Sequence, residues 1–176
     1  MAIYYGDGTN SNGSSTGGRI VQCVTAAKNN HTNHTGNSWS TNVPSLNPSI
    51  TLSDSNNKVL IIYAINVSAA ANVYSAQVRL VRGSTALGTG GLGHSSQVAA
   101  NNHFFTSYDA YSSYGFECLS NGYLDAPGSG THSYGLQIRS GYSNFQIWVN
   151  RTYQNQSANN SGSASSYITL FEIAHT

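Results

Sequence analysis

Residues 58–67 read Lys58-Val59-Leu60-Ile61-Ile62-Tyr63-Ala64-Ile65-Asn66-Val67 and contain the longest apolar run of the chain. Side chains alternate between the two faces of a β-strand. Both faces would be apolar here, with Val59, Ile61, Tyr63, Ile65 and Val67 on one and Leu60, Ile62 and Ala64 on the other. An antiparallel sheet usually keeps one face in water. The stretch therefore predicts a strand with a second packing surface, and a subunit interface is the simplest candidate.

Similar short runs lie on both sides of this strand, each bounded by Gly, Asn, Asp or Ser. No stretch of helical length has helical spacing of its apolar residues, so the runs predict strands. They are Arg19–Ala26, Ser49–Ser53, Val73–Arg82, His103–Tyr108, Tyr114–Leu119, Ser133–Arg139, Phe145–Asn150 and Ser165–Ala174. Short strands at regular spacing indicate an all-β protein, a sandwich or barrel of about nine to ten antiparallel strands.

The last run has the clearest alternation. Ile168, Leu170 and Glu172 fall on one face, and Tyr167, Thr169, Phe171 and Ile173 fall on the other. In residues 145–150, Phe145, Ile147 and Val149 similarly oppose Gln146, Trp148 and Asn150.

Charged residues are scarce, at 7% of the chain, and the formal net charge is +1. Without a basic cluster the sequence predicts no binding of nucleic acid, and without a long apolar run it predicts no membrane insertion.

The first residues lack the features of a secretory signal peptide. Cys23 and Cys118 are then expected to be reduced and mostly buried thiols, with a single bridge between them as the alternative.

Motifs for chemistry are weak, and we predict no catalytic residues, no cofactor and no metal site. Residues 88–93 match the G-x-G-x-x-G expression, but no helix pattern follows to receive a pyrophosphate. His31 and His34 lack a third ligand nearby in sequence. The six Asp and Glu residues are scattered, and no nucleophile-elbow motif is present.

Two segments are candidates for binding partners. Residues 1–17 contain one apolar group, Ile3, Tyr4 and Tyr5, followed by a polar, Gly-rich tether, so we expect them to form an attachment arm. Tyr108, Tyr111 and Tyr114 alternate with Ser, Asp and Ala, a composition that suits contact with a glycan or a protein partner. An edge strand packed on a neighbouring subunit is the alternative for these tyrosines.

Residues 18–176 resemble a β domain of structural proteins from tailed bacteriophages, including phages of marine bacteria and cyanobacteria. The similar segments occur in the same order in both. They are residues 18–26 (Gly18-Arg19-Ile20-Val21-Gln22-Cys23-Val24-Thr25-Ala26), 49–61, 78–88 (from Val78-Arg79-Leu80-Val81-Arg82-Gly83), 123–140 (from Tyr123-Leu124-Asp125-Ala126-Pro127) and 149–173, which ends in Tyr167-Ile168-Thr169-Leu170-Phe171-Glu172-Ile173.

The resemblance implies a jelly-roll sandwich that forms homotrimers, as in tumour-necrosis-factor-like and complement-like domains. It implies a non-enzymatic virion protein, made in the bacterial cytoplasm and displayed on the virion surface as a capsid knob or decoration. Other virion proteins, in the capsid shell or tail, would hold it through the arm. The alternative that the resemblance leaves is a tail-fibre tip or adhesin that binds a host-surface glycan.

Overall fold

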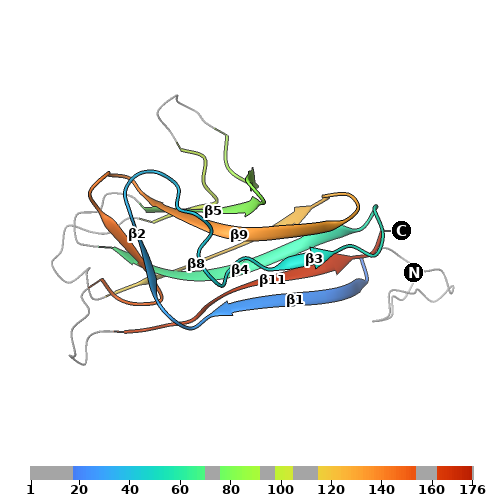
Figure 1. The fold of residues 1–176 in the computed structure, drawn as a ribbon, viewed down its shortest axis with the longest axis horizontal. Helices are drawn as coiled ribbons and strands as arrows, with labels where there is room; N and C mark the ends of the chain where they lie inside the picture. The colour runs from blue at the N-terminus through green and yellow to red at the C-terminus, as the bar shows by residue number, and fades with distance from the viewer. Residues whose placement is uncertain (1–17, 70–75, 92–97, 105–114, 154–161, 176) are drawn as a thin grey trace, which may run out of the picture.

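The computed structural model describes residues 18–69, 76–91, 98–104, 115–153 and 162–175, and within these ranges it contains strands and no helix. Two antiparallel sheets face each other (Figure 1). The larger sheet comprises β1 (Ile20–Lys28), β2 (Thr32–Thr35), β4 (Lys58–Ala69), β8 (Glu117–Asp125), β10 (Gln146–Val149) and β11 (Ser166–Ile173). The smaller comprises β3 (Ser49–Thr51), β5 (Ala76–Arg82), β6 (Thr85–Leu87), β7 (Asn102–Phe104) and β9 (Thr131–Ser140). The predicted all-β, sandwich-like class is confirmed.

The strand β4 organises the larger sheet. It pairs with β8 along one edge, and along the other it pairs first with β11 and then with β10. β1 continues the sheet beyond β11, and β2 continues it beyond β10. In the smaller sheet β9 and β5 are central, with β3 on the outside of β9 and both β6 and β7 on β5.

The core lies between the sheets and is apolar. Its largest fully buried side chains are Tyr63, Tyr134, Leu46, Ile50, Ile61, Ile65, Leu80, Leu136, Ile138, Ile147, Ile168 and Leu170. The alternation predicted for β4 and β11 is confirmed by the buried side chains of one face, although Ala64, which was predicted on the other face of β4, is only 7% exposed. In β10 the predicted alternation of Ile147 and Val149 with Gln146 and Trp148 is confirmed, and Asn150, which lies beyond the strand, is 1% exposed.

Three strands differ from the sequence prediction. The sequence does not predict β2 or β6 as strands, since Thr32–Thr35 is polar and Thr85–Leu87 is short. β8 continues to Asp125, through Asn121-Gly122, although that dipeptide usually marks a turn. Its whole length pairs with β4, from Glu117 opposite Val67 to Asp125 opposite Val59. Ladder pairing with the central strand outweighs the local turn preference.

The side chain of Asn150 forms hydrogen bonds to both the end of β1 and the start of β11. Asn150 follows β10 and has a left-handed conformation with φ of 65°. Its Nδ2 donates to the carbonyl oxygens of Lys28, at 2.7 Å, and Asn30, at 3.1 Å. Its Oδ1 accepts from the hydroxyl of Ser166 at 2.5 Å. Asparagine tolerates positive φ better than most residues, so one side chain sets both the turn and these contacts.

At the opposite end of the sandwich, the buried carboxylate of Glu172 holds three segments together. Oε1 accepts from the Ser53 backbone and hydroxyl at 2.8 and 2.7 Å and from Asn57 Nδ2 at 2.6 Å. Oε2 accepts from Gln22 Nε2 at 2.6 Å. Desolvation alone would raise the pKa of Glu172, but the hydrogen bonds from Asn57, Gln22 and Ser53 outweigh it and lower the pKa to about 2.

This lowered pKa predicts a stability loss in acid. A group whose pKa is lower in the folded state stabilises the fold above its unfolded pKa, and the contribution disappears as pH falls through the folded value. We expect Glu172→Gln to reduce the free energy of unfolding by about 2 kcal/mol at pH 7. In urea titrations the gap between the two proteins should close as pH falls from about 4.5 towards 2. A gap that is the same at pH 7 and pH 2.5 would contradict this assignment.

The two cysteines correct the prediction of mostly buried thiols, since both are free and exposed. Their side chains lie on the outward side of the larger sheet, where the alternation of β1 and β8 places them. β11 and β4 separate the two strands, so at about 4.8 Å per strand the Cα atoms of Cys23 and Cys118 lie at least about 14 Å apart. A disulfide needs Cα atoms within about 7 Å, so a bridge within one chain is excluded.

Candidate functional site

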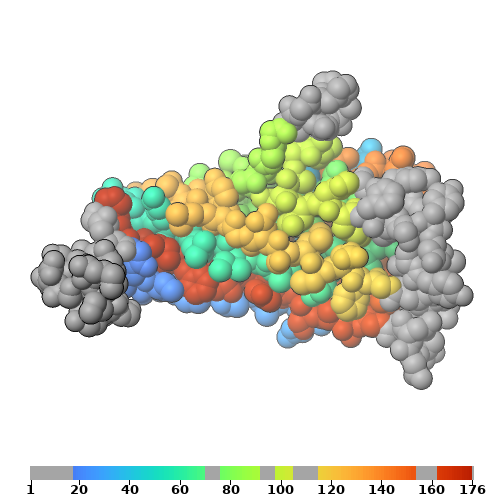
Figure 2. Space-filling view, turned by 180° about the vertical axis from the view of Figure 1, so that it is seen from behind, coloured from blue at the N-terminus to red at the C-terminus, as the bar shows by residue number. Residues whose placement is uncertain are grey.

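The first candidate surface is the outward side of the larger sheet where β1, β11, β4 and β8 lie side by side; we call it the outer face. Strand register places one side chain in every two on it. Its members are Ile20, Cys23, Thr25, Ala27, Leu60, Ile62, Ala64, Asn66, Cys118, Ser120, Gly122, Leu124, Tyr167, Thr169, Phe171 and Ile173. Figure 2 shows parts of β1 (blue), β11 (red), β4 (teal) and β8 (gold) as neighbouring bands.

Large apolar side chains of the outer face are open to solvent. Ile62 is 40% exposed, Tyr167 44%, Leu124 50% and Ile20 56%. Within these four strands, Lys58 at the end of β4 is the one charged side chain that the register places outward. Contiguous apolar patches on a protein surface mark contact sites for other proteins or for membranes. The doubly apolar β4 therefore has one face in the core and the other on a surface whose charge is confined to Lys58 at one end.

The second candidate is a half-open pocket of about 330 Å³ between β2 and residues 39–44. It is lined by Thr32, Asn33, His34, Trp39, Ser40, Thr41, Asn42, Val43, Pro44 and Ile138. In β2, Thr32 and His34 pair with Val149 and Ile147 of β10, whose side chains are buried. The same register turns these two side chains towards the space between the sheets, so the pocket is an opening in the side of the sandwich.

Residues 39–44 form the other wall because they run along the free edge of β9. Ser40 N donates to the Ile138 carbonyl at 2.9 Å, and Val43 N donates to the Leu136 carbonyl at 2.7 Å. The amide of Asn42 lies over Gly135 of β9, where a Cβ atom would come within 2.5 Å of Nδ2. A side chain at position 135 would therefore force the Asn42 amide to move.

Two arginines hold the Trp39 ring. The Arg79 guanidinium lies 4.4 Å from the ring centroid and that of Arg139 lies 5.9 Å from it. Burial lowers the pKa of Arg79, and the neighbouring charge of Arg139 lowers it further. Arg79 also donates to Gln137 Oε1 at 2.8 Å, which fixes its position. The indole is therefore oriented before any ligand arrives.

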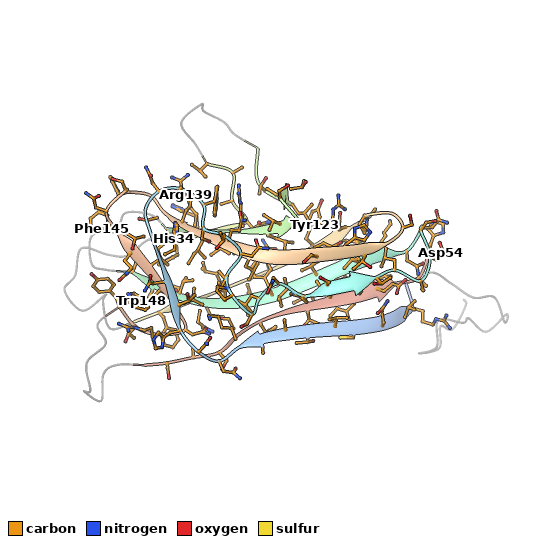
Figure 3. The ribbon with its side chains drawn as sticks, in the orientation of Figure 1. His34, Asp54, Tyr123, Arg139, Phe145 and Trp148 are labelled. Atoms are coloured by element: carbon orange, nitrogen blue, oxygen red, sulfur yellow. The ribbon has the colours of Figure 1, made fainter. Side chains whose placement is uncertain are left out.

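The second tryptophan lies at the same end of the sandwich in a different setting. Figure 3 places Trp148 near His34, Arg139 and Phe145 and far from Asp54. The Arg151 guanidinium lies 3.7 Å from the Trp148 ring centroid, and the His31 ring meets Trp148 edge-on at 5.8 Å. Trp148 does not line the pocket.

The structure describes some of the candidate site residues from the sequence and does not group them into a site. His31 and His34 are apart, since His31 contacts Trp148 and His34 Nε2 bonds to the Ser38 carbonyl at 2.8 Å. Within the described ranges no three His, Cys, Asp or Glu side chains are grouped as metal ligands. Gly88 to Gly91 form a loop without a following helix in the part described. The arm residues Ile3, Tyr4 and Tyr5, and Tyr108, Tyr111 and Tyr114, lie outside the described residues.

Besides Glu172, the carboxylates of Asp125 and Asp54 have structural partners. Asp125 accepts from Arg82 at 2.7 Å and from the Tyr134 hydroxyl at 2.8 Å. Desolvation, followed by this contact with Asp125, raises the pKa of Tyr134. Asp54 accepts from the backbone of Asn56 at 2.8 Å, as in a local turn.

No protein-family model matches the chain, and no curated protein matches it. Among the described residues, no helix is long and apolar enough to cross a membrane. The pocket was not predicted from the sequence. One signal points to it: Trp39 is a lone aromatic residue within the polar run Asn37-Ser38-Trp39-Ser40-Thr41-Asn42.

Proposed function

We propose that the sandwich is a jelly roll that assembles into a homotrimer and serves as a non-enzymatic knob on the surface of a phage virion. The strand pairing supports the first part. A jelly roll is a long hairpin rolled up, so the first strand pairs with the last, the second with the last but one, and so on inwards. Leaving out β2, β6 and β10, the pairs β1–β11, β3–β9, β4–β8 and β5–β7 follow this order.

The outer face carries the proposal of a trimer. It combines exposed Ile62, Leu124 and Tyr167 with a lack of charged side chains across its centre. A closed ring of three copies would turn each outer face towards a common axis and remove its apolar area from water. The same ring would leave the polar smaller sheet on the outside. The interface predicted from the sequence of residues 58–67 would then be this surface.

The positions of the chain ends support attachment through the arm. Gly18 N donates to the Ala174 carbonyl at 3.1 Å, and Ala174 N donates to the Arg19 carbonyl at 2.8 Å. β1 thus begins where β11 ends, at one end of the sandwich (Figure 1). In a trimer with parallel subunits, the arms of all three copies would leave from the same end. Three weak anchors on one particle bind with avidity.

Deletion of residues 1–17 tests the attachment role. We expect the truncated protein to keep its trimeric state and its melting temperature, because the described fold begins at residue 18. It should no longer be incorporated into particles, as measured by mass spectrometry of purified virions. The matched control replaces Ile3, Tyr4 and Tyr5 by serine and leaves the tether in place; it should lose incorporation as well. Normal occupancy of the truncated protein would place attachment in the sandwich itself.

A further inference from the structure

We propose that the pocket between β2 and residues 39–44 is a binding site for a neutral saccharide. The first argument is charge. His34 is the one titratable residue among those that line the pocket, and none of them is an Asp, Glu, Lys or Arg. A ligand held there has to be recognised by hydroxyl, amide and apolar groups. Saccharides without acidic substituents offer both hydroxyl groups and apolar C–H faces.

The walls supply an apolar platform beside polar groups. Trp39, Pro44, Val43 and Ile138 provide the apolar lining, and Val43 and Ile138 are 2% and 1% exposed. The half-buried Trp39 ring is fixed by Arg79, so stacking a sugar ring on it costs little conformational entropy. A volume of about 330 Å³ is at the small end of ligand sites. This size favours one sugar unit rather than a long oligomer.

Hydrogen-bonding groups remain available on both sides. A carbonyl can only accept, so His34 Nε2 carries the hydrogen in its bond to Ser38, and Nδ1 is left for a ligand. Asn42 accepts from Gln137 through Oδ1 at 3.1 Å, and its Nδ2, which packs against Gly135, is the donor end of the amide. Thr32 adds a hydroxyl that can donate or accept.

The place of the pocket fits recognition at a surface. β2 lies at the end of the sandwich opposite the start of β1 and the end of β11 (Figure 1). If the arm holds the protein at its base, as proposed above, the pocket lies at the outer end. The binding site itself does not depend on the arm, on the trimer or on a virion.

The two tryptophans allow a direct test in the full-length protein. In a ¹⁵N-labelled sample each indole N–H gives its own resonance, and a Trp148→Phe variant assigns the pair. The probes are glucose, galactose, mannose and N-acetylglucosamine, with glucuronic acid as the charged comparison. We expect the Trp39 resonance to shift saturably with at least one neutral sugar, at a Kd of about 1–10 mM. The Trp148 resonance should stay in place.

Variants separate binding from folding. Trp39→Ala should weaken the affinity at least tenfold, and Thr32→Val, which keeps the side-chain shape, about threefold to tenfold. Trp148→Ala is the matched control and should bind as the wild type does; the melting temperature checks the fold of each variant. The proposal is wrong if no neutral sugar shifts Trp39, if both indoles shift alike, or if glucuronic acid alone binds. A failure here leaves the trimer and the attachment role intact.

Discussion

Replacing Ile62 by aspartate should convert the proposed trimer into monomers of 18.7 kDa. Ile62 is in the middle of the outer face, with Thr169 and Gly122 as its neighbours across the strands. It is 40% exposed in the single chain, so an aspartate there is hydrated and the fold tolerates it. In the trimer the same substitution would bring three carboxylates towards the axis without partners. Each unpaired buried charge costs several kcal/mol, which is more than the interface can offset.

Sedimentation velocity measures this result directly. Ser129→Asp is the matched control, because Ser129 is exposed in the loop before β9, away from the outer face. The control variant should sediment as the trimer. An Ile62→Asp protein that keeps the sedimentation coefficient of the wild type would show that the subunits meet elsewhere.

Asn150→Ala should cost about 3–4 kcal/mol of folding stability, the largest loss expected from a single substitution outside the apolar core. The change removes the donor to the carbonyls of Lys28 and Asn30 and the acceptor of the Ser166 hydroxyl, which still accepts from Asn66 N. Each unsatisfied buried group costs about 1–3 kcal/mol, though relaxation makes the sum smaller. Alanine also adopts φ of 65° less readily than asparagine.

Asn150→Gly separates the two effects, because glycine adopts positive φ freely but lacks the amide. We expect its stability to fall between those of Asn150→Ala and the wild type. Urea unfolding in the Ile62→Asp background avoids the dependence of stability on subunit concentration. Equal stability of Asn150→Ala and the wild type would mean that the amide contacts contribute nothing to the fold.

Much of the fold could be predicted from the sequence because apolar alternation is strong in its central strands. In β4 and β11 the apolar alternation predicts the buried face, whose members Ile61, Ile168 and Leu170 are fully buried. β2 could not be found this way, since Thr32–Thr35 is polar and becomes a strand only by pairing with β10. The cysteines were misjudged because Cys23 and Cys118 behave as small apolar residues on a face that is apolar yet open.

The candidate sites were harder to predict, for a related reason. The outer face was indicated by Leu60 and Ile62, but its extent depends on which strands flank β4. The pocket combines His34 and Trp39 with Ile138, and only the antiparallel packing of β9 beside residues 39–44 brings these together. Sequence patterns report local periodicity, whereas the pocket is made by long-range contacts.

The labelling rate of Cys23 by a maleimide tests the central claim, that copies of this chain cover one another's outer faces. Cys23 is outward on β1 beside Phe171 and exposed in the single chain. With Cys118 changed to serine, it is the one thiol of the molecule. The account predicts slow labelling of the native protein, and rapid labelling when Ile62→Asp separates the subunits. Rapid labelling of the native protein, at a rate independent of concentration and equal to that of the Ile62→Asp variant, would contradict it.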